Sequence, residues 1–460
     1  MSLKTVSNMS FQGDVSDLPP LTAPMPANGL YYADFINGVY ISNVGNVFYK
    51  NKLFGTAMAF GRPSIASVIN EYGGLQYAQE GVPRTDRHPV TKKILGFRVE
   101  NSTTNQAINA VDMTTAAYTA AGLSVSAPSN GWCTLTESSM NELHVLTDTQ
   151  SQIDTALYNA VSVYAKYISA QYLQIQVLGA GAQAFANFDV RNRKVTRMGQ
   201  LAVSATASAG FDGSTRCELS VKGNNIATGT VRYSIISDPL AEPGVAYAGS
   251  GRSLLLGQAQ IEKNTYHASS PFFPAGATGG TTGANRRVDN AALLPVPAAN
   301  QSRFSVFIKG VMPPVEYGNG GGNNLISLLN TPLKKYAGFG LAARTSSYAY
   351  RSIISHNINE GSTLTGFPFN GKTFAPYGEY ALMITVDGGT LKVYSGMTDA
   401  PETLMTGVPA FDTVVLGGNS IISGTVINLA GMWGAWLQKA VLFDSALSDA
   451  DMIAQFELLS

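Results

Sequence analysis

Apolar and polar residues alternate with a period of two along most of this chain. Residues 173–177 place three apolar side chains on one face and two glutamines on the other, and residues 161–166 alternate in the same way. This pattern is typical of half-buried antiparallel strands. A helical pattern is confined to residues 449–458, where Ser448 can cap the first turn and Asp451 can lie favourably within it. The pattern predicts an all-β chain that closes with one short helix.

Turn residues separate the predicted strands. Residues 191–193 predict a hairpin tip, and Asp387 with the two glycines after it predicts a turn before a strand at 391–394. The segment 274–283 is rich in Gly and Thr with almost no large side chains, which indicates a linker. Runs of short strands on both sides of this linker predict two β-sandwiches in tandem.

These signals divide the chain into four parts. Residues 1–28 contain several prolines and predict an extended arm, since proline cannot donate to a ladder of hydrogen bonds. Residues 29–89 predict a small β lead-in subdomain at the entrance to the first sandwich. Residues 90–293 predict a sandwich of the jelly-roll type, and residues 294–460 predict a second sandwich.

Composition excludes several classes of protein. Charged residues make up 13% of the chain, against about 25% in ordinary globular proteins. Lys plus Arg and Asp plus Glu number 30 each, so we expect no nucleic-acid partner, because that function needs a basic surface. No segment reaches the roughly 18–20 apolar residues of a membrane helix, and residues 1–10 lack a signal-peptide core. We therefore expect no membrane insertion and no usual secretory export.

Candidate chemistry is sparse. Cys133 and Cys217 have no metal-binding spacing, and we expect buried free thiols on paired strands of one sandwich. Core packing is expected for at least two of the three tryptophans, Trp132, Trp433 and Trp436. The histidines are scattered without a metal-binding pattern, at His88, His144, His267 and His356. No nucleophile elbow or phosphate loop is present. We predict no catalytic residues, no cofactor, no metal and no enzyme, while a carboxylate pair formed in space stays open.

The most specific motif spans residues 83–105. It places Pro-Arg, Asp, Pro, Gly, Glu and Thr-Asn at set intervals, at Pro83, Arg84, Asp86, Pro89, Gly96, Glu100, Thr104 and Asn105. The motif resembles a signature of bacteriophage virion proteins from tails, fibres and capsid surfaces, in which a β-sandwich follows. The resemblance implies structural roles for Arg84, Asp86, Glu100 and Asn105. We expect Arg84 and Asp86 to form a structural pair or turn clamp.

Flanking segments extend the resemblance over most of the chain beyond about residue 30. Those similar to the same virion proteins are 34–35, 61–64, 72–75, 257–262 and 285–289. Those similar to laminin-G or concanavalin-like lectin sandwiches are 304–309, 387–389 and 443–450. The resemblance therefore implies that 294–460 is a concanavalin-like sandwich and that the arm anchors the chain to a particle.

Glycan binding needs aromatic platforms with amide and backbone partners, since sugar faces are apolar and their hydroxyl groups need directed hydrogen bonds. Two clusters supply these residue types. The candidate glycan contacts are Tyr317, Asn319, Asn323, Asn324, Tyr348, Tyr350 and Arg351. Strand packing or solvated loops are the alternative interpretation, because Tyr and Asn are abundant throughout.

The resemblance favours a structural virion protein, a fibre or surface decoration, assembled in the host cytoplasm. Its expected partners are other virion proteins, further copies of itself in a homo-oligomer, and a host-surface polysaccharide. Two alternatives stay open: a polysaccharide-degrading tail spike and a cellular carbohydrate-binding adhesin. Attachment to capsid or tail, the number of subunits and the glycan are not determined by the sequence.

Overall fold

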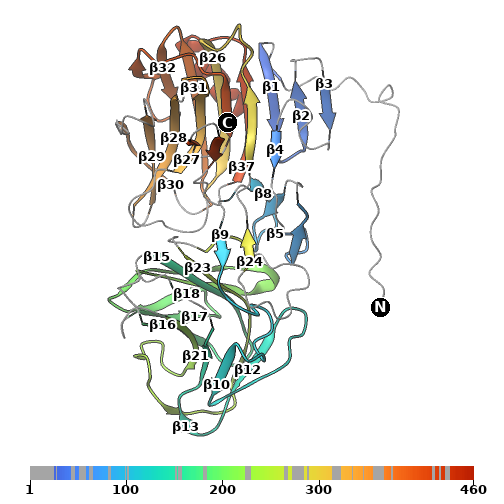
Figure 1. The fold of residues 1–460 in the computed structure, drawn as a ribbon, viewed down its shortest axis with the longest axis vertical. Helices are drawn as coiled ribbons and strands as arrows, with labels where there is room; N and C mark the ends of the chain where they lie inside the picture. Colours follow the sequence, from blue (N-terminus) through green and yellow to red (C-terminus); the bar gives the residue numbers. More distant parts are fainter. Residues whose placement is uncertain are drawn as a thin grey trace, which may run out of the picture.

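The computed structural model shows two β-sandwiches at opposite ends of an elongated molecule (Figure 1). The structure describes residues 25–26, 28–42, 47–50, 59–61, 66–80, 84–98, 100, 103–150, 153, 158–179, 184–222, 229–263, 268–271, 284–286, 290–312, 323–333, 335–344, 347–355, 367–374, 377–416, 420–423, 426–429 and 436–460. Of the predicted arm, residues 1–24 and 27 lie outside this description.

The first sandwich packs a six-stranded sheet against an eight-stranded sheet. The six-stranded sheet has the order β10 (Tyr118–Ala121), β14 (Val145–Asp148), β21 (Thr230–Ile236), β16 (Tyr172–Leu178), β17 (Phe185–Asp189), β18 (Lys194–Met198). The eight-stranded sheet has the order β11 (Leu123–Val125), β12 (Cys133–Glu137), β23 (Ser253–Lys263), β15 (Tyr158–Tyr167), β20 (Thr215–Lys222), β19 (Ala202–Ala209), with β9 (Thr103–Asn105) on β23 and β24 (Ala284–Arg286) on β9. A short ribbon of β13 (Asn141–Glu142) and β22 (Tyr247–Ala248) lies at one end.

The second sandwich packs a ten-stranded sheet against a seven-stranded sheet. The ten-stranded sheet has the order β3 (Val47–Lys50), β2 (Val39–Ser42), β1 (Gly29–Asp34), β37 (Trp436–Phe443), β26 (Arg303–Val311), β31 (Glu379–Asp387), β32 (Thr390–Tyr394), β33 (Glu402–Thr406), with β8 (Ile94–Arg98) on β37 and β7 (Thr85–Arg87) on β8. The seven-stranded sheet has the order β30 (Phe367–Phe374), β29 (Ser347–Ser355), β28 (Lys335–Arg344), β27 (Asn323–Asn330), β34 (Thr413–Leu416), β25 (Asn290–Pro295), β4 (Ala59–Gly61). Two hairpins stand apart: β5 (Ala66–Ile69) with β6 (Leu75–Ala78), and β35 (Ser420–Ser423) with β36 (Val426–Leu429).

The predicted all-β fold of tandem sandwiches is confirmed. The alternation in β26 shows why it could be predicted: Phe304, Val306 and Ile308 enter the core between the two sheets, while Phe307 points to the opposite face. On that face lies α1 (Asp449–Leu459), the one α-helix of the described residues, which packs Met452 and other apolar side chains against the ten-stranded sheet. No helix in the described part of the chain is long and apolar enough to cross a membrane.

The sequence correctly predicted one helix cap and two turns between strands. The Ser448 hydroxyl accepts a hydrogen bond from the Asp451 N–H at 3.2 Å, as predicted for the cap of α1. The turn before β32 contains Gly388 and Gly389 with φ of 54° and 95°, values that glycine adopts without strain. The hairpin tip predicted at 191–193 joins β17 to β18.

The prediction that one face of the strand at residues 173–177 is exposed to water is wrong. Gln174 and Gln176 of β16 are only 2% and 6% exposed, so both faces of the strand are buried. The reason is a loop that lies over the face expected in water. Gln174 donates to the backbone oxygen of Ala241 in this loop at 3.3 Å, and to the side-chain oxygen of Asn187 at 2.8 Å.

The strands of the predicted lead-in pair mainly with the second sandwich. β1 lies against β37 and β4 lies against β25, so both sheets of that sandwich are extended by N-terminal strands. The expected position at the entrance to the first sandwich fits only part of the lead-in: β5 lies between the two sandwiches, near β9 and β24 (Figure 1). The sequence boundaries at 28, 89 and 293 stay predictions.

The two cysteines are buried free thiols, as expected. Cys133 lies on β12 and Cys217 on β20 of the same sheet, but the expectation that these strands pair is wrong, because β23 and β15 lie between them. Burial raises the pKa of both thiols, which keeps them protonated and unreactive near neutral pH. Trp132 and Trp436 are both core residues, while Trp433 lies outside the described residues.

Candidate functional site

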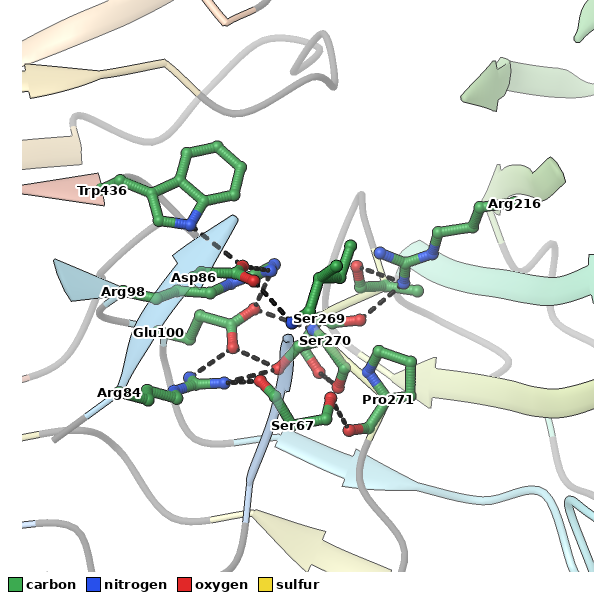
Figure 2. Close-up of polar contacts among 12 residues, drawn as sticks. Ser67, Arg84, Asp86, Arg98, Glu100, Arg216, Ser269, Ser270, Pro271 and Trp436 are labelled. Carbon is green, nitrogen blue, oxygen red and sulfur yellow. Dashed lines mark hydrogen bonds and ion pairs between the residues drawn. The ribbon is translucent and has the colours of Figure 1, made fainter. Parts of the chain in front are cut away.

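Arg84 and Glu100, two residues of the virion-like motif, form a buried ion pair between the sandwiches (Figure 2). The Arg84 guanidinium donates to Glu100 Oε2 at 2.5 Å and, through its other terminal nitrogen, to the backbone oxygen of Ser67 at 2.8 Å. Both side chains are almost entirely shielded from water. The pair therefore ties the start of β7 to the hairpin β5–β6 from within.

Asp86 connects this pair to the second sandwich. Its Oδ2 accepts from Arg98 at 2.7 Å and from the indole N–H of Trp436 at 3.0 Å (Figure 2). Arg98 also donates to Glu100 at 2.9 Å and lies over the ring of Trp436, with its guanidinium carbon 5.1 Å from the ring centroid. Since Trp436 begins β37, the network reaches the centre of the ten-stranded sheet.

Ser270 connects the pair to the first sandwich. Its N–H and hydroxyl donate to the two oxygens of Glu100 at 2.8 and 2.5 Å. The neighbouring carbonyl of Ser269 accepts from Arg216 of β20 at 2.5 Å, and its hydroxyl donates to Glu262 of β23 at 2.7 Å. We name these connected residues the polar joint: Ser67, Arg84, Asp86, Arg98, Glu100, Arg216, Glu262, Ser269, Ser270 and Trp436.

Two further motif residues have clear structural roles. Asn105 accepts from the N–H groups of Ala107 and Ile261 and donates to the carbonyl of Ala259, so it joins β9 to β23. Gly96 has φ of 130°, and a side-chain carbon there would come within 2.3 Å of the backbone oxygen of Leu437. Only glycine lets β8 approach β37 this closely.

The charges at the centre of the polar joint are balanced. Two guanidinium groups, Arg84 and Arg98, face two carboxylates, Asp86 and Glu100. Burial opposes the charged form of Arg98, but the carboxylates of Glu100 and Asp86 outweigh it and raise its pKa. Each oxygen of both carboxylates already accepts two hydrogen bonds. Such saturated, buried groups are suited to holding parts of a fold together.

Five of the seven predicted glycan contacts lie on two strands of the seven-stranded sheet. Tyr317 and Asn319 lie outside the described residues. Asn323 and Asn324 begin β27, whereas Tyr348, Tyr350 and Arg351 belong to β29, and β28 lies between the two strands. The register aligns Asn323, Leu341 and Tyr350 in one row, and Asn324, Gly340 and Arg351 in the next. Their glycan role stays a prediction.

A second polar site, which the sequence did not indicate, lies on the outer face of the six-stranded sheet. We name it the loop cleft; its lining comes from β14, β16, β21 and the loop between β21 and β23. Its empty volume, counted out to solvent, is about 340 Å³. Polar groups of the lining include Gln174, Gln176, Arg232, Ser234 and Glu242. The register pairs Gln176 with Arg232 and Gln174 with Ser234, which sets two polar rows side by side.

The loop at residues 237–252 is held at several points. Near its start, Thr196 donates to the backbone oxygen of Pro239 at 2.7 Å, and Arg197 forms an ion pair with Glu242. Near its end, Glu137 accepts from the Tyr247 hydroxyl at 2.6 Å and from the Arg252 guanidinium at 2.8 Å. The wall of the loop cleft is therefore fixed before any ligand binds.

His144 lies in the same wall and is hydrogen-bonded on both sides. Its Nδ1 is 2.7 Å from the carbonyl oxygen of Gly122, and its Nε2 is 3.1 Å from that of Tyr247. His88, in contrast, accepts from the N–H groups of Val90 and Thr91, the structural role expected at a turn. Within the described residues, no group of three or more potential metal ligands converges.

The comparisons with known proteins give distant structural likenesses. No family model and no curated protein matches the chain. Domain 4 of AbnA, a GH43 extracellular arabinanase from Geobacillus stearothermophilus solved with arabinotriose, is 15% identical over 37% of this chain and 72% of its own, with a TM-score of 0.22. Trypanosoma rangeli sialidase with sialic acid is 12% identical over 74% of this chain and 62% of its own, at 0.26. Domains LG4-5 of the mouse laminin alpha1 chain are 11% identical over 67% of this chain and 90% of their own, at 0.20.

These likenesses change one expectation and leave another untouched. Laminin G domains are among the similar structures. The prediction that the chain is not an enzyme is corrected: an arabinanase and a sialidase are also among them, so the non-enzyme class is withdrawn. TM-scores this low assign no activity or ligand. Nothing in these comparisons bears on the phage resemblance.

Proposed function

We propose that this chain is a bacteriophage virion protein that attaches through its N-terminal region and presents two joined β-sandwiches to glycans on the host surface. The observation that carries the proposal is the polar joint. Arg84, Asp86 and Glu100 belong to the motif that resembles virion proteins, and these same residues lie at the centre of the joint. A protein that must transmit force between a particle and a cell benefits from such a rigid connection.

The path of the chain supports an N-terminal attachment. β1 pairs with β37, and the side chain of Asn28 donates to Ser445 at 3.2 Å. The chain therefore enters the structure at the second sandwich, and an arm of residues 1–28 would attach there. The first sandwich then lies farther from the particle. In this arrangement the second sandwich serves as the base, and both sandwiches remain available to the host surface.

Glycan binding is proposed for residues 294–460 through the row that contains Asn324 of β27 and Arg351 of β29, with Gly340 of β28 between them. Amide and guanidinium groups are types that hold sugar hydroxyls. Because a shallow surface buries little area, we expect affinities of about millimolar to micromolar per site. Many copies on one particle would raise the effective affinity.

The attachment is tested by deleting residues 1–28 from the gene in the phage genome. We expect the shortened protein to fold and remain in solution but to be absent from purified particles, as measured by quantitative mass spectrometry of the particles. The full-length protein carrying the same C-terminal tag is the control. Normal incorporation of the shortened protein would place the attachment elsewhere, and absence of the full-length protein from particles would refute the virion assignment.

Glycan binding is tested with the full chain on an array of host-surface saccharides, followed by titration of each hit. We expect Arg351→Ala to weaken a hit about tenfold, as hydrogen bonds to sugar hydroxyls worth about 1–1.5 kcal/mol are lost. Arg193→Ala is the matched control, because Arg193 is exposed at the β17–β18 hairpin tip of the first sandwich. No hit in a multivalent format would refute glycan recognition, and release of new reducing ends would instead indicate a glycoside hydrolase.

A further inference from the structure

The loop cleft contains a cation without a counter-ion. Arg232 makes no hydrogen bond or ion pair with any other described residue, and its Nε is shielded from water without a partner. The neighbouring Glu242 does not neutralise it, because that carboxylate is paired with Arg197. The other arginines of the polar joint and of the wall of the loop cleft all have carboxylate partners, so Arg232 differs from them.

An unpaired, partly buried guanidinium is costly in the free protein. Shielding a charged group from water without a compensating partner is unfavourable, and a bound anion removes this cost. The planar fork of arginine matches a carboxylate with two parallel hydrogen bonds. Arg197 and Glu242 cancel, so the charge of the cleft is positive.

The groups around Arg232 suit a sugar more than a bare anion. The register places Gln176 beside Arg232 on β16, and Ser234 two residues along β21 on the same face. An amide and a hydroxyl can each donate to and accept from sugar hydroxyl groups. The cleft is small, so it fits the charged edge of one sugar residue at a time. Its wall is already fixed by Glu137 and Thr196, which lowers the cost of ordering on binding.

We propose that the loop cleft of the first sandwich binds the carboxylate of an acidic saccharide, a uronic acid or a sialic acid, through Arg232. Gln176 and Ser234 contact the hydroxyl groups of the same sugar residue. This inference rests on the proposed glycan recognition and adds a second, charge-selective site to it. The site lies on the sandwich that is farther from the proposed attachment, where a host polysaccharide would be met first.

The test is titration of the full chain with two pairs of probes that differ in the carboxylate. One pair is trigalacturonic acid and its methyl ester, and the other is sialyllactose and its methyl ester, so the result also separates uronic from sialic acids. We expect one acidic probe to bind at least tenfold more tightly than its neutral partner. We expect Arg232→Gln to abolish that preference, while Arg193→Gln, an exposed arginine at the β17–β18 hairpin tip, leaves it unchanged.

Chemical shifts of residues in β16 and β21 on binding locate the site. Equal binding of acidic and neutral probes, or full binding by Arg232→Gln, would overturn the inference while leaving neutral glycan recognition at residues 294–460 intact. Equally strong displacement by acetate would show a general anion pocket and would also overturn it. If neither sandwich binds any saccharide, the proposed glycan recognition fails together with this site. Melting curves of both variants confirm that they remain folded.

Discussion

Two ion pairs with buried carboxylates lie where separate parts of the fold meet. The pair Arg84–Glu100 lies between the sandwiches, and the pair Arg252–Glu137 holds the wall of the loop cleft. Removing charges from water is costly, so such pairs persist only where several hydrogen bonds compensate. In both pairs the carboxylate accepts further hydrogen bonds from hydroxyl or backbone N–H groups. These two ion pairs therefore mark the places where neighbouring parts of the fold are held in a fixed position.

Arg84→Ala should lower the free energy of unfolding by about 3–5 kcal/mol, because it leaves the Glu100 carboxylate buried without its partner. The measurement is chemical denaturation followed by intrinsic fluorescence. Lys93→Ala is the control, since the ion pair of Lys93 with Glu379 is exposed, at 72% and 45% of the two side chains. Equal effects of the two substitutions would contradict the structural role of Arg84.

Glu137 gives a pH-dependent prediction. Burial alone would raise its pKa, but hydrogen bonds from Arg252, Tyr247 and Ser250 outweigh burial and lower the pKa to about 2. Because the folded-state pKa lies below the ordinary value of about 4.3, the stabilisation is complete above that value and is lost as pH falls toward 2. Glu137→Gln should therefore destabilise the protein at pH 7, on the order of 2 kcal/mol.

The same substitution should matter less as the solution becomes acidic. The difference in unfolding free energy between the original chain and Glu137→Gln should shrink between pH 4.5 and 2.5, measured by urea denaturation at each pH. Glu242→Gln, at an exposed ion pair, serves as the control. A difference that stays constant with pH would contradict the lowered pKa of Glu137 in the folded protein.

At the scale of elements, close approach of strands explains part of the motif. β8 and β37 pair only because Gly96 has no side chain and adopts a positive φ. Gly96→Ala should lower the free energy of unfolding by more than the about 1 kcal/mol expected from the backbone conformation alone. Gly407→Ala is the matched control, since Gly407 has φ of 76° but open space around it. If thermal melting shows that both substitutions lower stability by similar amounts, the close approach of Gly96 to Leu437 does not contribute to the loss.

The elements that could be predicted from sequence are those set by local chemistry. The alternation in β26, the glycines before β32 and the Ser448 cap each depend on neighbouring residues, and all three appear in the structure. The motif also indicated residues that prove to be buried. The pairing of β1 with β37 and of β4 with β25 could not be predicted, because it depends on contacts across most of the chain.

The sites were harder to predict than the fold for the same reason. Ser270 and Trp436 complete the polar joint from two segments outside the motif, and Arg98 lies within the span of the motif at a position that the motif does not specify. The loop cleft was missed because Gln174 and Gln176 have the pattern of a solvent face. The loop that covers them lies more than fifty residues along the chain, so only the folded structure reveals the buried polar surface.

For the whole molecule, the polar joint makes the two sandwiches one unit. The connections run from Trp436 of the second sandwich through Asp86 and Glu100 to Ser270, and so to the first sandwich. A rigid connection matters for the proposed function, because it sets where the loop cleft points relative to the proposed N-terminal attachment. A flexible connection would instead let the first sandwich sample many orientations.

The rigid connection is tested most directly by differential scanning calorimetry of the full chain and of Asp86→Ala. We predict one cooperative transition for the original chain and two separate transitions for Asp86→Ala, because that substitution removes the partners of Arg98 and Trp436 and uncouples the sandwiches. Asp387→Ala, at an exposed ion pair with Arg303, should keep a single transition. A single transition at an unchanged melting temperature in Asp86→Ala, or two transitions in the original chain, would contradict a joint that couples the two sandwiches.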